Sequence, residues 1–86
     1  MPYMTVGIYD GKCGYDYNGA AIEIGSVVET AREWDRGFEA ALLFRFEPAP
    51  QVCVDRARAA LKRAGRTHVW IIVTPRPGAN DPPIMP

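Results

Sequence analysis

The sequence predicts a single small α/β domain, built from a mixed five-stranded sheet and two helices. Three observations lead to this prediction. Two dipeptides typical of two-residue hairpin turns lie close together near the start of the chain. Two segments carry apolar residues at helical spacing, and two later segments have the apolar patterns of strands. In chain order the elements are three strands, a helix, a strand, a helix and a final strand.

Two hairpin turns organise the first 25 residues. Asp10-Gly11 and Asn18-Gly19 are both dipeptides of the type I′ turn. If both form turns, a single register follows, and it places one set of apolar side chains on the same face of a three-stranded meander. That set consists of Met4, Val6, Ile8, Cys13, Tyr15, Tyr17, Ala20, Ile22 and Ile24.

Two further segments have the spacing of amphipathic helices. Ser26 and Glu29 form a capping box at the start of the first, and Gly37 ends it. The second follows Pro48 and ends at Gly65. The inner stripes are Val27, Val28, Ala31 and Trp34 in the first helix, and Val54, Ala57, Leu61 and Ala64 in the second.

The remaining strands are predicted at residues 38–47 and 69–73. Aromatic residues alternate along the first segment, and a strand would line them up where a helix would scatter them. The second segment is continuously apolar, as expected of a strand covered on both faces. Residues 75–86 read PRPGANDPPIMP. Since proline breaks both helices and inner strands, we expect one domain over residues 1–74 and a Pro-rich tail over residues 75–86.

The order of these elements resembles the ribonuclease H-like fold, including its ribosomal-protein branch. In sequence the resemblance rests on the fragments IYDG, at the end of the first strand, and VTPRP, after the last strand. In a sheet of order 3-2-1-4-5, right-handed crossovers would place both helices on the same face.

This resemblance makes a metal-dependent nuclease one alternative function. Nucleases of the fold hold Mg²⁺ with carboxylates on the first strand, the first helix and the end of the fourth strand, and Asp10, Glu29 and Glu47 would occupy these places. Two-metal hydrolysis needs such carboxylates to cluster. Each acid also has a structural explanation, in a hairpin turn, a capping box and a proline turn, and the acid expected on a final helix is missing. We therefore predict no catalytic residues, no metal site and no cofactor.

Cysteine catalysis is also disfavoured. Cys53 lies in the first turn of a helix, where a thiolate is stabilised, but nothing places His68, the only histidine, near it. Cys13 and Cys53 lie far apart and match neither a disulfide framework nor a zinc-ligand spacing. We expect two buried, unpaired thiols and, with no signal peptide or membrane span in the sequence, a cytoplasmic protein.

The charge distribution supports nucleic-acid binding only weakly. Ten basic and ten acidic residues cancel, whereas dedicated nucleic-acid-binding domains usually carry a basic excess. Arg58, Lys62 and Arg66 recur every four residues and would form a basic ridge on the second helix, able to contact phosphates. A solvated helix face is the preferred explanation, and an RNA- or DNA-binding protein is a second alternative.

The face of the sheet opposite the helices is the predicted interaction surface. The helices would cover Phe44 together with the apolar face of the meander, and the prolines at the end of the chain exclude a third helix. The uncovered face would then show Tyr9, Ala41 and Leu43, with either Trp70 and Ile72 or Val69, Ile71 and Val73. An uncovered apolar patch of about a few hundred Å² usually marks an interface.

We therefore expect a small, non-enzymatic partner-binding protein, in the class of inhibitors, antitoxins, immunity proteins and phage-type counter-defence proteins. Because a net charge of zero leaves little repulsion between copies, a homodimer or other homo-oligomer is the leading expectation. A different protein partner is the other expectation, and no membrane contact is expected. The predicted partner-binding residues are Tyr9, Ala41, Leu43, Trp70 and Ile72.

Overall fold

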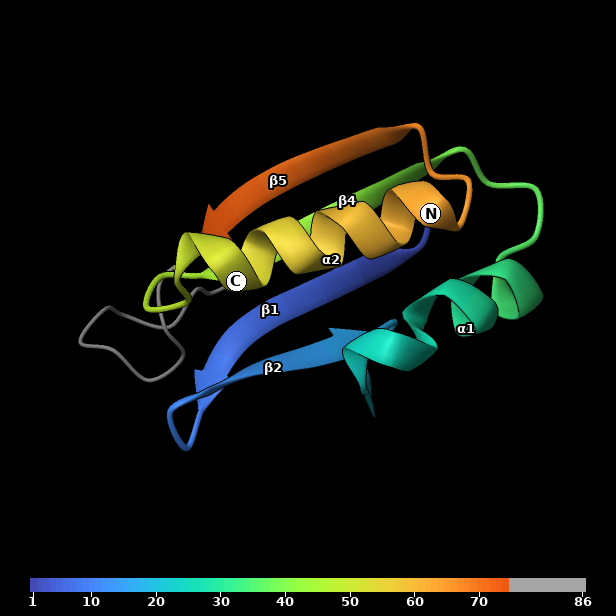
Figure 1. Cartoon of the computed structure of the whole chain (residues 1–86). Coiled ribbons are helices and arrows are strands. Elements are labelled where there is room, and N and C mark those ends of the chain that lie inside the picture. Colours follow the sequence, from blue (N-terminus) through green and yellow to red (C-terminus); the bar gives the residue numbers. More distant parts are fainter. Residues whose placement is uncertain (75–86) are drawn as a thin grey trace.

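The computed structural model describes residues 1–74, in which two helices cover one face of a five-stranded sheet (Figure 1). The strand order is β3-β2-β1-β4-β5, as predicted. β1 is antiparallel to β2 and parallel to β4, and β5 is parallel to β4. The predicted tail at residues 75–86 lies outside the described residues. The elements are β1 (Tyr3–Tyr9), β2 (Lys12–Tyr17), β3 (Ala20–Ile22), η1 (Ile24–Ser26), α1 (Val27–Trp34), β4 (Ala40–Phe46), α2 (Gln51–Arg63) and β5 (His68–Thr74).

The predicted register of the meander is confirmed. Val6 pairs with Tyr15, and Tyr15 pairs with Ile22. Both central residues of each hairpin turn have the positive φ that a type I′ turn requires, at Asp10 (53°), Gly11 (75°), Asn18 (51°) and Gly19 (91°). The third strand is shorter than predicted, because the chain leaves the sheet after Ile22 and winds into the 3-10 turn η1.

Helix α1 begins without the predicted capping box. An N-cap residue needs an extended backbone, but η1 already winds the chain, and Ser26 has helical angles and makes no capping hydrogen bond. Two apolar side chains of this region are also more exposed than predicted. Trp34 ends α1 with its ring tilted against Tyr17, and Phe38 precedes β4 instead of belonging to it.

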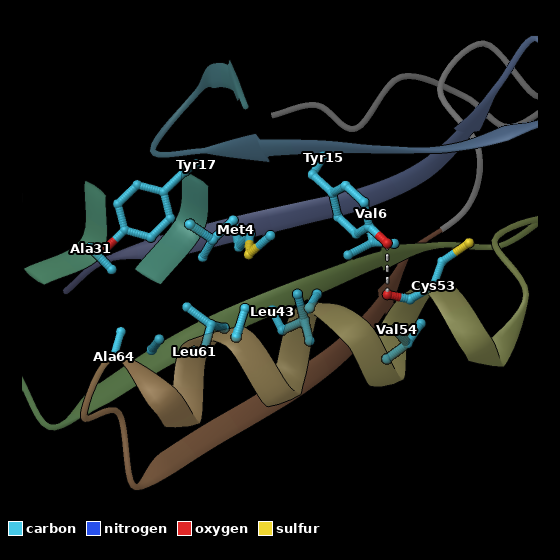
Figure 2. Packing of buried hydrophobic residues seen from close by; sticks show 14 of the residues in the cluster. Met4, Val6, Tyr15, Tyr17, Ala31, Leu43, Cys53, Val54, Leu61 and Ala64 are labelled. Carbon is cyan, nitrogen blue, oxygen red and sulfur yellow. Dashed lines mark hydrogen bonds between the residues drawn. The ribbon is translucent and has the colours of Figure 1, made fainter. Parts of the chain in front are cut away.

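The hydrophobic core lies between the sheet and the helices (Figure 2). Small residues on α2 let it approach the sheet closely, and Ala57 and Ala60 are fully buried. Tyr15 points into the same core, where its hydroxyl donates to the Cys53 carbonyl oxygen at 3.4 Å. The largest fully buried side chains are Tyr17, Met4, Leu43, Leu61, Val6, Val27 and Val54.

Strand β4 presents the opposite face to the one predicted. Parallel pairing sets Leu43 beside Met4, so both point toward the helices, and Ala41 and Leu43 are fully buried. Phe44, predicted to be covered by the helices, points away from them together with Leu42. The apolar pattern alone pointed to the wrong face, because the set with Leu42, Phe44 and Phe46 is wholly apolar, whereas the set that faces the core includes Arg45. The face was set by the register with β1.

Arg66 is a buried cation that joins the ends of both helices. Helix α2 ends at Arg63, and Gly65 (φ 94°) turns the chain so that Arg66 points inward, with only 2% of it exposed. Its guanidinium donates to four carbonyl oxygens, those of Ala31 (2.7 Å), Asp35 (2.9 Å), Phe38 (2.9 Å) and Ala64 (3.1 Å). Carbonyls at helix C-termini carry partial negative charge, so this site stabilises the cation in place of water.

We predict that Arg66→Met destabilises the domain by about 3–5 kcal/mol, because it removes the buried donor that four carbonyl oxygens share. Arg66→Lys should recover only part of this loss, since an ammonium cannot reproduce the planar fork of donors. Urea unfolding followed by circular dichroism measures both effects. Arg63→Met, at an exposed position in the same region, is the control and should change stability by less than about 0.5 kcal/mol. A fully stable Arg66→Met variant would contradict this role.

Tyr17 extends the same cluster toward the sheet. Its hydroxyl donates to Asp35 Oδ2, which also accepts a hydrogen bond from Asn18 Nδ2 at 3.1 Å. Burial, and then the hydrogen bond to the Asp35 carboxylate, raise the pKa of Tyr17 to about 12. Both causes favour the neutral phenol, so the folded state holds this proton more tightly than the unfolded chain does.

We predict that the free energy of unfolding decreases as pH rises from about 10 toward 12, because the unfolded state loses the Tyr17 proton first. Tyr17→Phe should remove much of this pH dependence. At pH 7 the same variant should lose about 1 kcal/mol through the missing hydrogen bond. Tyr3→Phe, at a more exposed tyrosine, is the control and should keep the alkaline decrease. An identical pH profile for Tyr17→Phe and the wild type would disprove the assignment.

Candidate functional site

The face of the sheet that the helices leave uncovered divides into an apolar and a polar half. The parallel register of β4 and β5 brings Leu42 beside Trp70 and Phe44 beside Ile72, so that one apolar surface runs across the two strands. Tyr3 of β1 borders it, with its ring edge-on to Phe44 at 6.1 Å between centroids. We call Tyr3, Leu42, Phe44, Phe46, Trp70 and Ile72 the apolar half. The polar half lies over β1 and β2, where Thr5 Oγ1 donates to Asp16 Oδ2 at 3.2 Å.

Two glycines shape the border between the halves. Gly7 and Gly14 are directly paired on β1 and β2, and the ring of Tyr9 lies over them. A Cβ atom on Gly14 would come within 1.9 Å of that ring, and one on Gly7 would lie 3.3 Å from both Tyr9 and Phe46. The missing side chains therefore let the Tyr9 ring lie over the sheet, on the side where Phe46 approaches Gly7. Tyr9 as a whole remains 53% exposed.

Three of the five predicted partner-binding residues lie on this face. Trp70 and Ile72 belong to the apolar half, with 53% and 38% of each residue exposed, and Tyr9 borders it. Ala41 and Leu43 were wrongly predicted and belong to the core. Sequence reasoning missed Leu42 and Phe44, which replace them. The signal that would have found them is the pairing of β4 with β1, which the sequence does not display.

The three candidate metal ligands do not converge. Asp10 lies at the tip of the β1–β2 turn, Glu29 in the first turn of α1, and Glu47 directly after β4, and all three are exposed. Within residues 1–74, no group of three or more His, Cys, Asp or Glu residues is placed to hold a metal ion. The described part of the chain thus offers no carboxylate cluster for the nuclease alternative.

The predicted basic ridge loses one of its three members. Arg58 and Lys62 are exposed on α2, but Arg66 lies beyond the helix and is buried against main-chain carbonyls. The prediction assumed that the helix continues as far as Arg66. The helix ends at Arg63, and the turn at Gly65 directs the Arg66 side chain inward. The nucleic-acid alternative rests on the two remaining cations.

A half-open pocket lies between α1 and β3, lined by Tyr17, Ala20, Ala21, Ile22, Thr30 and Trp34. Ligand sites usually combine an apolar lining with a few convergent polar groups. Here the Tyr17 hydroxyl is already engaged with Asp35. The pocket is therefore a weaker candidate site than the apolar half of the sheet.

The two cysteines form a disulfide, contrary to the prediction of unpaired thiols. Cys13 of β2 and Cys53 of α2 are bonded, with their Cα atoms 5.7 Å apart. Cys53 is fully buried. The pairing could not be predicted from the sequence, because the two residues are 40 positions apart and meet only when α2 packs on the sheet. A disulfide removes both thiols as candidate nucleophiles. Because disulfides persist mainly in oxidising environments, the predicted cytoplasmic location loses the support of unpaired thiols.

Comparison with known proteins finds no matching family model, no similar curated protein and no similar solved structure. Among residues 1–74, no helix is long and apolar enough to cross a membrane. The case for a site therefore rests on the geometry of this chain alone.

We predict that the disulfide stabilises the fold by about 2–4 kcal/mol, because it closes a long loop in the unfolded chain. The bonded residues are 40 positions apart. The double variant Cys13→Ala/Cys53→Ala should lose this amount in urea unfolding. Reducing the wild type should produce a similar loss, whereas the same reductant should leave the double variant unchanged. A wild type whose unfolding is indifferent to reductant would contradict the prediction.

Proposed function

We propose that this protein is a small, non-enzymatic protein-binding module that acts through the apolar half of the sheet. The class we favour is that of inhibitors, antitoxins, immunity proteins and phage-type counter-defence proteins, in which one small domain acts by contact. The observation that carries the proposal is the uncovered surface made by Leu42, Phe44, Trp70 and Ile72. Apolar patches that remain exposed on a folded domain usually mark interfaces.

The composition of the surface supports recognition of a protein. Aromatic residues are enriched at protein interfaces, and tryptophan and tyrosine are frequent among the residues that dominate binding energy. Trp70 is such a residue, and Tyr3 and Tyr9 stand at the rim of the same surface. Strand pairing and ring contacts fix their positions before a partner arrives, which lowers the entropic cost of binding.

The energy gained by burying such a surface is comparable with the cost of association. Burial of about 600 Å² of apolar surface per partner contributes around 15 kcal/mol before association costs of similar size. The net affinity therefore depends on how well a partner fits the aromatic residues. An uncovered, mostly apolar sheet face favours a protein partner over a small molecule, because small-molecule sites are concave.

We predict that Trp70→Thr/Ile72→Thr abolishes capture of the native partner while leaving the domain folded. Threonine keeps the preference for strands, and both positions are exposed. The tagged full-length protein would be used to capture partners from native extract, and each candidate would then be measured as a purified pair. Trp34→Ala is the matched control, because Trp34 is equally exposed (57%) but lies on α1.

The same experiment separates the alternatives. Support requires a partner that binds the wild type and Trp34→Ala directly and fails to bind Trp70→Thr/Ile72→Thr. Capture that disappears after nuclease treatment, or on Arg58→Ala/Lys62→Ala, would replace this proposal with nucleic-acid binding. In that case affinity would also decrease steeply with salt.

A further inference from the structure

We propose that two copies of this chain pair through the outer edge of β5, in antiparallel orientation, to form one continuous sheet. This inference rests on the proposed function and specifies one partner, a second copy, and the way in which it binds. The first observation is the exposure of β5. Figure 1 shows β5 at the edge of the sheet, beside β4, and no described strand pairs with the outer side of β5.

Strand β5 is exposed on both of its faces. On the uncovered face, Trp70 and Ile72 are 53% and 38% exposed, and on the helix face Ile71 and Val73 are 39% and 60% exposed. A partner lying flat on the uncovered face would leave Ile71 and Val73 in water. A strand added along the edge would cover residues on both faces at once. Long apolar edge strands are ready templates for such pairing.

The main-chain groups on this edge have a defined order. His68 N donates to Glu39 O at 3.1 Å, and Thr74 O accepts from Glu47 N at 2.9 Å, so the even-numbered residues of β5 turn their main-chain groups toward β4. Because main-chain direction alternates along a strand, Val69, Ile71 and Val73 point their N–H and C=O groups outward. These three residues are available to a second strand.

The sequence of β5 complements itself about Ile71. In an antiparallel pair centred there, Ile71 meets Ile71 of the second copy, Val69 meets Val73, and Trp70 meets Ile72. The outward-facing residues then oppose one another, and each such pair can exchange two main-chain hydrogen bonds. The side chains form β-branched and aromatic pairs, which stabilise neighbouring strands, and no like charges face each other. A two-fold axis requires this kind of self-complementarity.

Other occupants of the edge fit less well. The opposite edge, β3, has only three residues, Ala20–Ile22, and offers a short ladder. Residues 75–86 include five prolines, which lack the N–H groups that a paired strand donates. A second copy brings the complementary strand itself, and it joins the two apolar halves into one wider surface for a further partner.

The test begins with sedimentation of the full chain at about 100 μM, where the wild type should be dimeric. Ile71→Lys places two ammonium groups opposite each other and should weaken the dimer at least about a hundredfold. Mixing Ile71→Lys with Ile71→Glu should restore a heterodimer, because opposite charges then face each other. Val52→Lys, on the exposed side of α2, adds the same charge and should leave the dimer intact.

Crosslinking tests the register even if Ile71→Lys fails to fold. Cα atoms of a directly opposed, hydrogen-bonded pair lie about 5.5 Å apart, within reach of a disulfide. Ile71→Cys should therefore give a covalent dimer under mild oxidation, since the native cysteines are already bonded to each other. Ile72→Cys should not, because its opposite residue is Trp70 of the second copy.

Each remaining outcome overturns the inference in a recognisable way. A strictly monomeric wild type refutes it and leaves the proposed binding of another protein untouched. A dimer broken by Trp70→Thr/Ile72→Thr but not by Ile71→Lys, and not crosslinked by Ile71→Cys, would instead be a face-to-face dimer. A variant ending at residue 74 that dimerises where the full chain does not would identify residues 75–86 as the occupant of the edge.

Discussion

The fold depends on a buried guanidinium that gathers the ends of both helices. Removing a cation from water is costly, and the structure compensates the cost at Arg66 with four carbonyl oxygens from α1, the segment before β4 and the end of α2. Two of these oxygens, those of Ala31 and Asp35, also accept main-chain hydrogen bonds, from Asp35 N and Phe38 N. The cation and the carbonyls therefore hold one another, and Tyr17 links the same cluster to the sheet through Asp35.

This cluster also fixes where the helices lie. Since α1 and α2 share one cation and both contribute side chains to the core cluster that contains Met4, Val6 and Leu43, they form a single layer on one face. The disulfide from Cys13 to Cys53 ties the other end of α2 to β2. Two helices fastened in this way cover the middle of the sheet, so the uncovered face and the outer strand β5 retain exposed apolar side chains.

The surface on which our proposals rest is thus a consequence of the layering. Aromatic rings gather over β4 and β5 because no described element covers them, and Gly7 and Gly14 let Tyr9 lie flat beside them. Edge pairing uses the outward main-chain groups of Val69, Ile71 and Val73, and it brings Trp70 beside Ile72 of the second copy without covering the face on which both side chains lie. A dimer joined at the edge would therefore keep its binding face free.

The sequence by itself determined the local structure. Asp-Gly and Asn-Gly dipeptides specify turns through backbone conformations that few other residues adopt, and the register of the meander followed from them. The order of the elements and the strand order of the sheet were likewise predictable, because helical and strand periods differ and crossovers have one handedness. The turn dipeptides and the periods of helices and strands are read within short segments, and crossover handedness is the same for nearly all chains.

Only the tertiary structure decided which side chains face which surroundings. The apolar pattern of β4 favours burial of Phe44, since the other set of side chains includes Arg45, yet pairing with β1 buries Leu43 and turns Phe44 outward. Arg66 fits the spacing of a surface ridge, yet one turn at Gly65 directs it into the core. Cys13 and Cys53 are distant in sequence and meet only when α2 packs on the sheet. Each case depends on contacts between distant segments, which no local pattern encodes.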